Sequence, residues 1–175
     1  MTPPGTSSVH ASAVLVGDRA VLIRGASGAG KSRLLFDLIL AGNARQIPEA
    51  MLVGDDRVFL KAKAGRLWVR PAPELAGLME VRGLGIRRLD FVSEAIVGLV
   101  VDLDAPDAAR LPATEALRTV IDGIELPRIP VGAGFYPLPL VVAALTTTES
   151  SRTCDPMDDC PKGIGNHISP TIATE

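Results

Sequence analysis

Residues 25–32 read GASGAGKS, and this stretch decides the fold. It follows the apolar run at residues 20–23 and precedes residues 34–40, where apolar side chains recur at helical spacing. The order of strand, glycine-rich loop and helix fits the phosphate-binding pattern G-x-x-x-x-G-K-[ST]. The four required positions of that pattern are Gly25, Gly30, Lys31 and Ser32.

The chemistry of phosphate binding explains this spacing. Backbone N–H groups surround a polyphosphate only if the loop curls without Cβ atoms in the way, which Gly25, Gly28 and Gly30 permit. The following helix adds its N-terminal dipole and its free N–H donors. In this pattern Lys31 reaches the β- and γ-phosphates, and the hydroxyl of Ser32 holds Mg²⁺. A chance glycine-rich turn is the alternative, and the strand–loop–helix context disfavours it.

Composition narrows the class of protein. The chain has 175 residues, 47% of them hydrophobic, which predicts one domain with a substantial core. The formal net charge is −2, no Lys/Arg run stands out, and only 3% of residues are aromatic. These values argue against a nucleic-acid-binding protein.

Targeting signals, apolar runs and cysteines indicate the cellular compartment. Residues 1–8 are polar and lack the basic region of a signal peptide, and no apolar run approaches the roughly 18 residues that span a bilayer. We therefore expect no membrane segment and a cytoplasmic location. Cys154 and Cys160 are separated by five residues, which is typical of neither zinc nor redox sites. They are expected to be free thiols in a reducing compartment.

Hydrophobic patterning predicts the remaining elements. A hairpin of strands 10–16 and 19–24, turning at Gly17 and Asp18, leads into the loop. A helix is expected over residues 31–41, ended by Gly42 and Asn43. The other expectations are a hairpin of 57–61 and 66–70, a helical turn at 74–78, a loop at 79–86, a buried strand at 95–103, edge strands at 119–126 and 128–131, and a helix at 138–147.

A pair of acids follows the strand predicted at residues 50–53. Asp55 and Asp56 come where a carboxylate emerges at the phosphate end of such a sheet. Adjacent strand residues point to opposite faces, so one acid can face Mg²⁺ or substrate while the fold holds the other. The alternative is an Asx turn, because Gly-Asp-Asp also suits a turn.

Two further features are weak by themselves. Glu80 and Arg82 lie beside Gly83 and Gly85, as in a loop whose backbone approaches a ligand. His10 at the start of a strand is most often a surface or capping histidine.

Taken together, His10, GASGAGKS, LVGDD at residues 52–56 and EVRGLGI at residues 80–86 occur in the order that is seen in the catalytic domain of bacterial HPr kinase/phosphorylase. The resemblance covers about residues 9–145, and EVRGLGI is its most specific part. Residues 1–8 are then expected to be flexible, residues 9–148 to form the catalytic domain, and residues 149–175 to form a flexible tail.

The resemblance implies an α/β fold with a P-loop kinase core of the HPr kinase and phosphoenolpyruvate carboxykinase type, in which helices flank a mixed sheet. It implies an ATP- and Mg²⁺-dependent kinase for a serine of HPr, the phosphocarrier of the sugar phosphotransferase system. Members are typically hexameric, and many also remove the phosphate by phosphorolysis.

The family's functional residues map onto this chain position by position. The resemblance assigns charge stabilisation to Lys31, the serine-proton base to the Asp55/Asp56 pair, with Asp56 preferred, and tuning of that base to His10. It assigns the binding of Mg²⁺ to Ser32 and Glu80. The nucleotide-binding set is Gly25, Ala26, Ser27, Gly28, Ala29, Gly30, Lys31 and Ser32, and the active-site wall is Arg82, Gly83, Leu84, Gly85 and Ile86.

The chain also departs from the family pattern. Few residues precede His10, as in short α-proteobacterial forms, and the linker 43–49 replaces a shorter basic turn. A late motif resembling PVRPGRN reads PVGAGFY at residues 130–136, without either arginine, and the Asp-Arg-x-Gly segment before it has no clear counterpart. Because these arginines serve phosphorolysis, the resemblance supports the kinase reaction and leaves phosphorolysis open. Two other functions stay open: a nucleotide-binding regulatory module without transfer activity, and a P-loop kinase for another substrate.

Overall fold

The computed structural model describes residues 7–148. The expectations for residues 1–6 and 149–175, including both cysteines, lie outside this range. The strands are β1 (Ser7–Val9), β2 (Ser12–Val16), β3 (Arg19–Arg24), β4 (Ala50–Gly54), β5 (Val58–Lys63), β6 (Arg66–Pro71), β7 (Leu78–Val81), β8 (Gly85–Arg88), β9 (Ala95–Leu103), β10 (Arg118–Ile121) and β11 (Ile124–Val131). The helices are α1 (Lys31–Asn43) and α2 (Leu138–Thr146), with short 3-10 turns η1 (Pro73–Leu75) and η2 (Thr114–Leu117).

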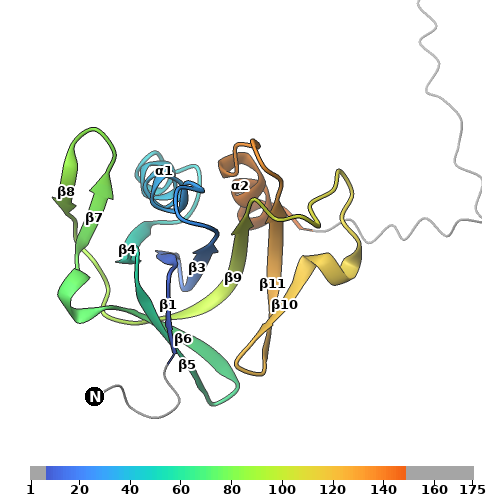
Figure 1. Cartoon of the computed structure of the whole chain (residues 1–175), viewed down its shortest axis with the longest axis horizontal. Coiled ribbons are helices and arrows are strands. Elements are labelled where there is room, and N and C mark those ends of the chain that lie inside the picture. Colours follow the sequence, from blue (N-terminus) through green and yellow to red (C-terminus); the bar gives the residue numbers. More distant parts are fainter. Residues whose placement is uncertain (1–6, 149–175) are drawn as a thin grey trace, which may run out of the picture.

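β9 is the strand on which the main sheet is built (Figure 1). From Val97 onward it pairs in parallel with β3 on one edge, and its residues 100–103 pair in parallel with β11 on the other. Its first residues pair antiparallel with β6 instead. The result is a nine-stranded mixed sheet in the order β1-β5-β6-β9-β3-β2-β4, with β11 and β10 attached through β9. The predicted α/β class with a mixed sheet and flanking helices is confirmed.

Both faces of β3 are buried, which explains its continuous apolar run. Val21 and Ile23 point into one core cluster, which includes the buried residues of α1. Ala20 and Leu22 point into a second cluster, formed with β5 and β6 on the opposite face. The strand that leads into the phosphate loop is therefore held from both sides.

The end of α1 differs from the prediction. The helix continues to Asn43, and Arg45 rather than a glycine takes the left-handed conformation, with φ 57°. Gly42 serves another purpose, because a Cβ atom there would lie 2.8 Å from the Cβ of Ala50 at the start of β4. Close packing of helix on strand, rather than helix termination, requires this glycine.

The predicted hairpins β2–β3 and β5–β6 are confirmed, and so is the long strand β9. The loop predicted at residues 79–86 is wrong, because these residues form the separate two-stranded sheet β7–β8. The single strand predicted at 119–126 is also wrong. The chain turns at Asp122 and Gly123, with φ of 49° and 77°, which is the positive-φ pair of a two-residue hairpin. That Asp-Gly dipeptide was the missed signal.

The boundaries at the start of the chain and at residues 74–78 also differ. β1 begins at Ser7 and pairs with β5, so two residues of the segment expected to be flexible belong to the sheet. The helical turn at 74–78 is confined to η1, and Leu78 already begins β7. Within residues 7–148 no helix is both long and apolar enough to cross a membrane.

Candidate active site

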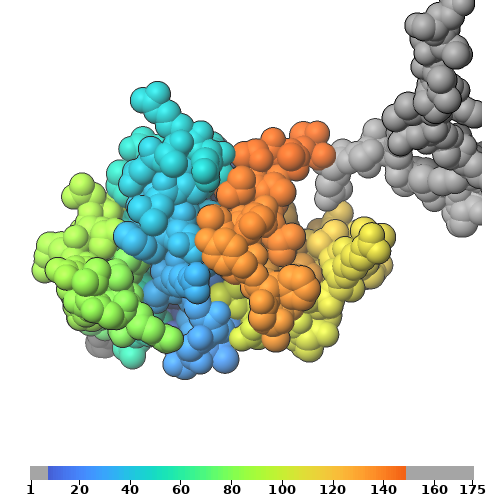
Figure 2. Space-filling model, turned by 90° about the horizontal axis from the view of Figure 1, so that it is seen from above, coloured from blue at the N-terminus to red at the C-terminus, as the bar shows by residue number. Residues whose placement is uncertain are grey.

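The phosphate loop opens into a cleft of about 850 Å³, within the range typical of small-molecule sites. Residues from the loop and the first two turns of α1 form its floor, β7 and Asp56 form one wall, and residues 134–137 form the other. In both Figure 1 and Figure 2 the β7–β8 hairpin lies on one side of α1, and the segment that leads into α2 lies on the other.

The loop has the backbone conformation that its sequence predicts. Gly28 and Gly30 have φ of 84° and 98°, which L side chains rarely adopt. A Cβ atom at either position would meet no protein atom within 4 Å, so the space beside the loop is open. α1 begins directly after Gly30, so its free N–H groups face this space.

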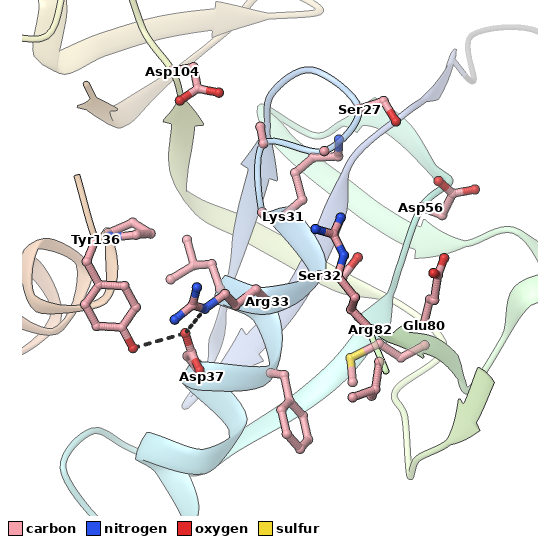
Figure 3. Close-up of a pocket in the computed structure, with 18 of the residues that line it drawn as sticks. Ser27, Lys31, Ser32, Arg33, Asp37, Asp56, Glu80, Arg82, Asp104 and Tyr136 are labelled. Carbon is pink, nitrogen blue, oxygen red and sulfur yellow. Dashed lines mark hydrogen bonds and ion pairs between the residues drawn. The ribbon is translucent and has the colours of Figure 1, made fainter. Parts of the chain in front are cut away.

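Lys31 is buried although it is charged, with 6% of its surface exposed. Its ammonium donates hydrogen bonds to the carbonyl oxygens of Gly25 and Ala26, both at 2.9 Å. Two of the three N–H donors of Lys31 therefore hold the loop closed on itself. The lysine is positioned at the floor of the cleft, between the two walls (Figure 3).

The two adjacent aspartates have separate environments. Asp55 is buried, with 3% exposed, and one of its oxygens accepts hydrogen bonds from the hydroxyls of Ser12 at 2.6 Å and Ser32 at 2.9 Å. Asp55 thus ties the last residue of the phosphate loop to β2. Ser12 was not predicted as a site residue, and only its hydrogen bond to Asp55, 43 residues away, connects it to the site.

Asp56 is exposed and faces the cleft. Its side chain is 70% exposed, and one carboxylate oxygen lies 3.0 Å from Nε2 of His10. β4 ends at Gly54, so the strand argument for opposite faces does not apply to these acids. They lie in a turn instead. Asp56 takes φ 64°, which Asp tolerates, and the N–H of Arg57 bonds to the carbonyl oxygen of Asp55 at 2.7 Å.

The segment EVRGLGI is divided between the cleft and the surface. Glu80 and Arg82 line the cleft, from the end of β7 and the turn that follows it. The structure does not place Gly83, Leu84, Gly85 or Ile86 among the residues that line it, so this part of the predicted wall is wrong. Gly83 and Leu84 lie in the β7–β8 turn, where Leu84 is 65% exposed, and Gly85 begins β8.

The oxygen donors at the cleft suit magnesium. Ser32 and Glu80 both line it, and Asp55 lies directly behind Ser32. No group of three or more His, Cys, Asp or Glu side chains placed to hold a metal occurs among residues 7–148. Mg²⁺ needs no such cage, because it usually keeps several waters and takes one or two protein oxygens together with substrate phosphates.

The second wall contains residues that the sequence reasoning missed. Tyr136 donates a hydrogen bond to Oδ2 of Asp37 at 3.1 Å, and the guanidinium of Arg33 lies 5.6 Å from the centre of the Tyr136 ring. Burial raises the pKa of Tyr136, and the Asp37 carboxylate raises it further. Phe135 lies beside them and is 74% exposed. No sequence pattern links residues 99 positions apart, as Tyr136 and Asp37 are.

A charged cluster lies just behind the loop. Arg24, the residue before Gly25, donates two hydrogen bonds of 2.7 Å to Asp102, and Arg128 donates one of 2.5 Å. Burial would raise the pKa of Asp102, but the two arginines outweigh it and hold that pKa below its ordinary value. The cluster joins the ends of β3 and β9 to the middle of β11 and so fixes where the phosphate loop begins.

Residues 4–146 match the family model described as the HPr serine kinase C-terminal domain. The chain belongs to this family. The match includes every residue that lines the cleft.

Individual relatives agree with this assignment. The HPr kinase/phosphorylase of Mycoplasma mycoides subsp. mycoides is 33% identical over 74% of this chain and 44% of its own length. That of Geobacillus thermodenitrificans is 36% identical over the same shares. The chain therefore spans less than half the length of these curated relatives.

A solved structure extends the likeness to three dimensions. The HPr(Ser) kinase/phosphatase of Coxiella burnetii superposes with a TM-score of 0.63 at 27% identity. The superposition covers 79% of this chain and 93% of that one, so the HPr kinase C-terminal domain described here shares its fold with that protein.

Proposed function

We propose that the protein is an ATP- and Mg²⁺-dependent kinase that phosphorylates a serine of HPr. One observation carries this proposal: a single cleft brings the phosphate loop together with the exposed, histidine-paired carboxylate of Asp56. The family membership and the names of the relatives supply the acceptor, HPr.

The loop, Ser32 and Glu80 have distinct roles in this reaction, and Asp55 supports one of them. The loop N–H groups and Lys31 bind the phosphates, and Lys31 stabilises charge on the group that is transferred. The oxygens of Ser32 and Glu80 hold Mg²⁺, which when bound neutralises phosphate charge. The Asp55 carboxylate keeps the Ser32 hydroxyl in place.

Asp56 is the proposed base because it is the acid of the pair that reaches the cleft. The serine oxygen forms a bond to the γ-phosphorus. The bond from that phosphorus to the oxygen bridging the β- and γ-phosphates breaks, and ADP leaves. The serine proton passes to Asp56. His10, at 3.0 Å, holds the orientation of that carboxylate.

The test is phosphotransfer with the full chain, Mg-ATP and purified HPr, followed by mass spectrometry of HPr. We expect one added phosphate on a serine, absent when that serine is replaced by alanine. ATP binding by calorimetry without any phosphate on HPr would contradict the kinase and favour a regulatory nucleotide-binding module. Transfer to another protein but not to HPr would assign a different acceptor.

Phosphorolysis needs its own assay. The cations that line the cleft in the described chain are Lys31, Arg33 and Arg82, with His10 beside Asp56. The motif at residues 130–136 supplies no arginine. Adding inorganic phosphate to phosphorylated HPr and measuring pyrophosphate determines whether the reaction also runs in this direction.

We further propose that the protein acts in the cytoplasm as a homo-oligomer, with a hexamer as the form that the family resemblance implies. Light scattering during size-exclusion chromatography measures the oligomeric mass directly. A monomer at the concentration of the kinase assay contradicts this part of the proposal.

A further inference from the structure

The two walls of the cleft differ in chemistry. The wall at Asp56, His10 and Glu80 carries charged groups. The opposite wall, at residues 134–137, carries Phe135 and Tyr136, although the charged residues Arg33, Asp37 and Asp104 also line the cleft. In Figure 3, Lys31 and Ser32 lie between Tyr136 on one side and Asp56 with Glu80 on the other.

The geometry of phosphoryl transfer indicates which reactant lies at each wall. The attacking oxygen and the leaving oxygen lie in line on opposite sides of the transferred phosphorus. If the acceptor serine lies at Asp56, the β- and α-phosphates must lead away from that wall. The nucleoside at the end of the phosphate chain then arrives at the wall formed by Phe135 and Tyr136.

These two aromatic side chains are unusual in the molecule. The chain has only four Phe, one Tyr and one Trp, and two of these six are adjacent here. Phe135 is 74% exposed and Tyr136 is 49% exposed, so neither belongs to the core. Exposed aromatic surface inside a concave site is what a flat, apolar ligand group requires.

The wall is also held in position before any ligand arrives. The N–H of Phe135 bonds to the carbonyl oxygen of Gly132 at 3.1 Å, which closes a turn. Tyr136 is fixed by its hydrogen bond to Asp37 and by the Arg33 guanidinium near its ring. Arg33 also lines the cleft, so its positive charge lies beside this wall.

We propose that Phe135 and Tyr136 form the nucleoside subsite of the cleft, in which the base of a nucleoside triphosphate stacks on the exposed ring of Phe135. The proposal rests on the proposed kinase function for the direction of the phosphate chain. It assigns a substrate-binding role to the segment where the family's arginines are absent.

The experiment compares two probes by calorimetry on the full chain: Mg-ATP and Mg-tripolyphosphate, which has the phosphates but no nucleoside. For Phe135→Ala we expect ATP binding to weaken on the order of 10-fold, as for loss of one stacking partner. Binding of tripolyphosphate is expected to be unchanged. Phe135→Trp is expected to restore ATP affinity, because it keeps a stacking surface.

A matched control removes an exposed apolar side chain elsewhere. Leu111 is 87% exposed, and it is not among the residues that line the cleft. Leu111→Ala is expected to leave the affinity for both probes unchanged. Thermal melting of each variant confirms that the fold is retained.

Several results overturn the proposal. Equal weakening for both probes assigns Phe135 to the phosphates or to loop structure. Unchanged ATP affinity with a raised KM for HPr assigns the wall to the acceptor protein. Wild-type protein that binds tripolyphosphate as tightly as ATP has no nucleoside subsite. Wild-type protein that binds neither probe contradicts the proposed function itself, which is a separate failure.

Discussion

The charged cluster behind the phosphate loop and the charged wall of the cleft use the same residue types in opposite ways. Asp102 is 15% exposed and is paired with Arg24 and Arg128. Asp56 is 70% exposed and is paired only with His10, itself half-exposed, in the contacts of the described chain. Buried, multiply bonded charges hold the chain in place, because removing one partner leaves the other uncompensated. Exposed, singly paired charges remain available to a substrate.

The largest expected effect belongs to the cleft. Asp56→Asn should lower phosphotransfer to HPr by about 10²- to 10⁴-fold, because the proton acceptor is lost. The free energy of unfolding should change by no more than about 0.5 kcal/mol, because the side chain is exposed. Quenched-flow transfer and urea unfolding measure the two quantities. Substantial remaining transfer would show that Asp56 is not the proton acceptor.

In the charged cluster behind the loop, a substitution should lower the free energy of unfolding. Asp102→Asn is expected to cost about 3 kcal/mol of folding free energy, because Arg24 loses its carboxylate partner and Arg128 keeps only that of Asp107. The matched control is Glu125→Gln, which breaks an exposed pair with Arg118, and it should cost at most about 0.5 kcal/mol. Equal losses from the two changes would refute the contrast between buried and exposed charges.

Removing the Ser12 hydroxyl tests how much a single hydrogen bond to a buried carboxylate contributes to stability. Ser12 is fully buried, and its hydrogen bond to Asp55 satisfies a buried carboxylate. Ser12→Ala should cost about 2 kcal/mol, the value of a hydrogen bond to a charged group. Ser93→Ala, at an exposed position, is the control and should change little. Chemical unfolding measures both variants, and a neutral Ser12→Ala would show that Asp55 needs only the Ser32 donor.

The smallest expected effect is a pH dependence. The pKa of Asp102 is lower in the folded protein than in the unfolded chain. Its stabilising contribution is therefore full above the ordinary aspartate pKa of about 4 and is lost as the pH falls through the lowered value. Between pH 7 and pH 3, wild type should lose more unfolding free energy than Asp102→Asn. Equal losses in the two proteins would show that other carboxylates determine the loss of stability in acid.

Part of the site could be predicted because its signals are local. The phosphate loop, its preceding strand and α1 are contiguous, so backbone conformation and spacing identify them together. The Asp-Gly turn at Asp122 and Gly123 was equally local and was missed only because an apolar pattern continues on both sides of it. The β7–β8 hairpin was missed because its glycines favoured a loop.

Other parts of the site were out of reach of sequence patterns. Arg24 and Asp102 are 78 residues apart, and only the parallel pairing of β3 with β9 brings them together. Tyr136 meets Asp37 because the segment before α2 folds back beside α1. Such contacts depend on which strands pair and how helices pack, and a local pattern does not encode either.

The sequence by itself determined that this protein has a glycine-rich loop between a buried strand and a helix, with an acid pair and the EVRGLGI segment following it. Those features follow from backbone freedom at glycine and from hydrophobic periodicity, which act over a few residues. Only the tertiary structure decided which aspartate is buried against Ser12 and Ser32 and which faces the cleft. The reason is that burial belongs to the packed sheet, where neighbours come from distant parts of the chain.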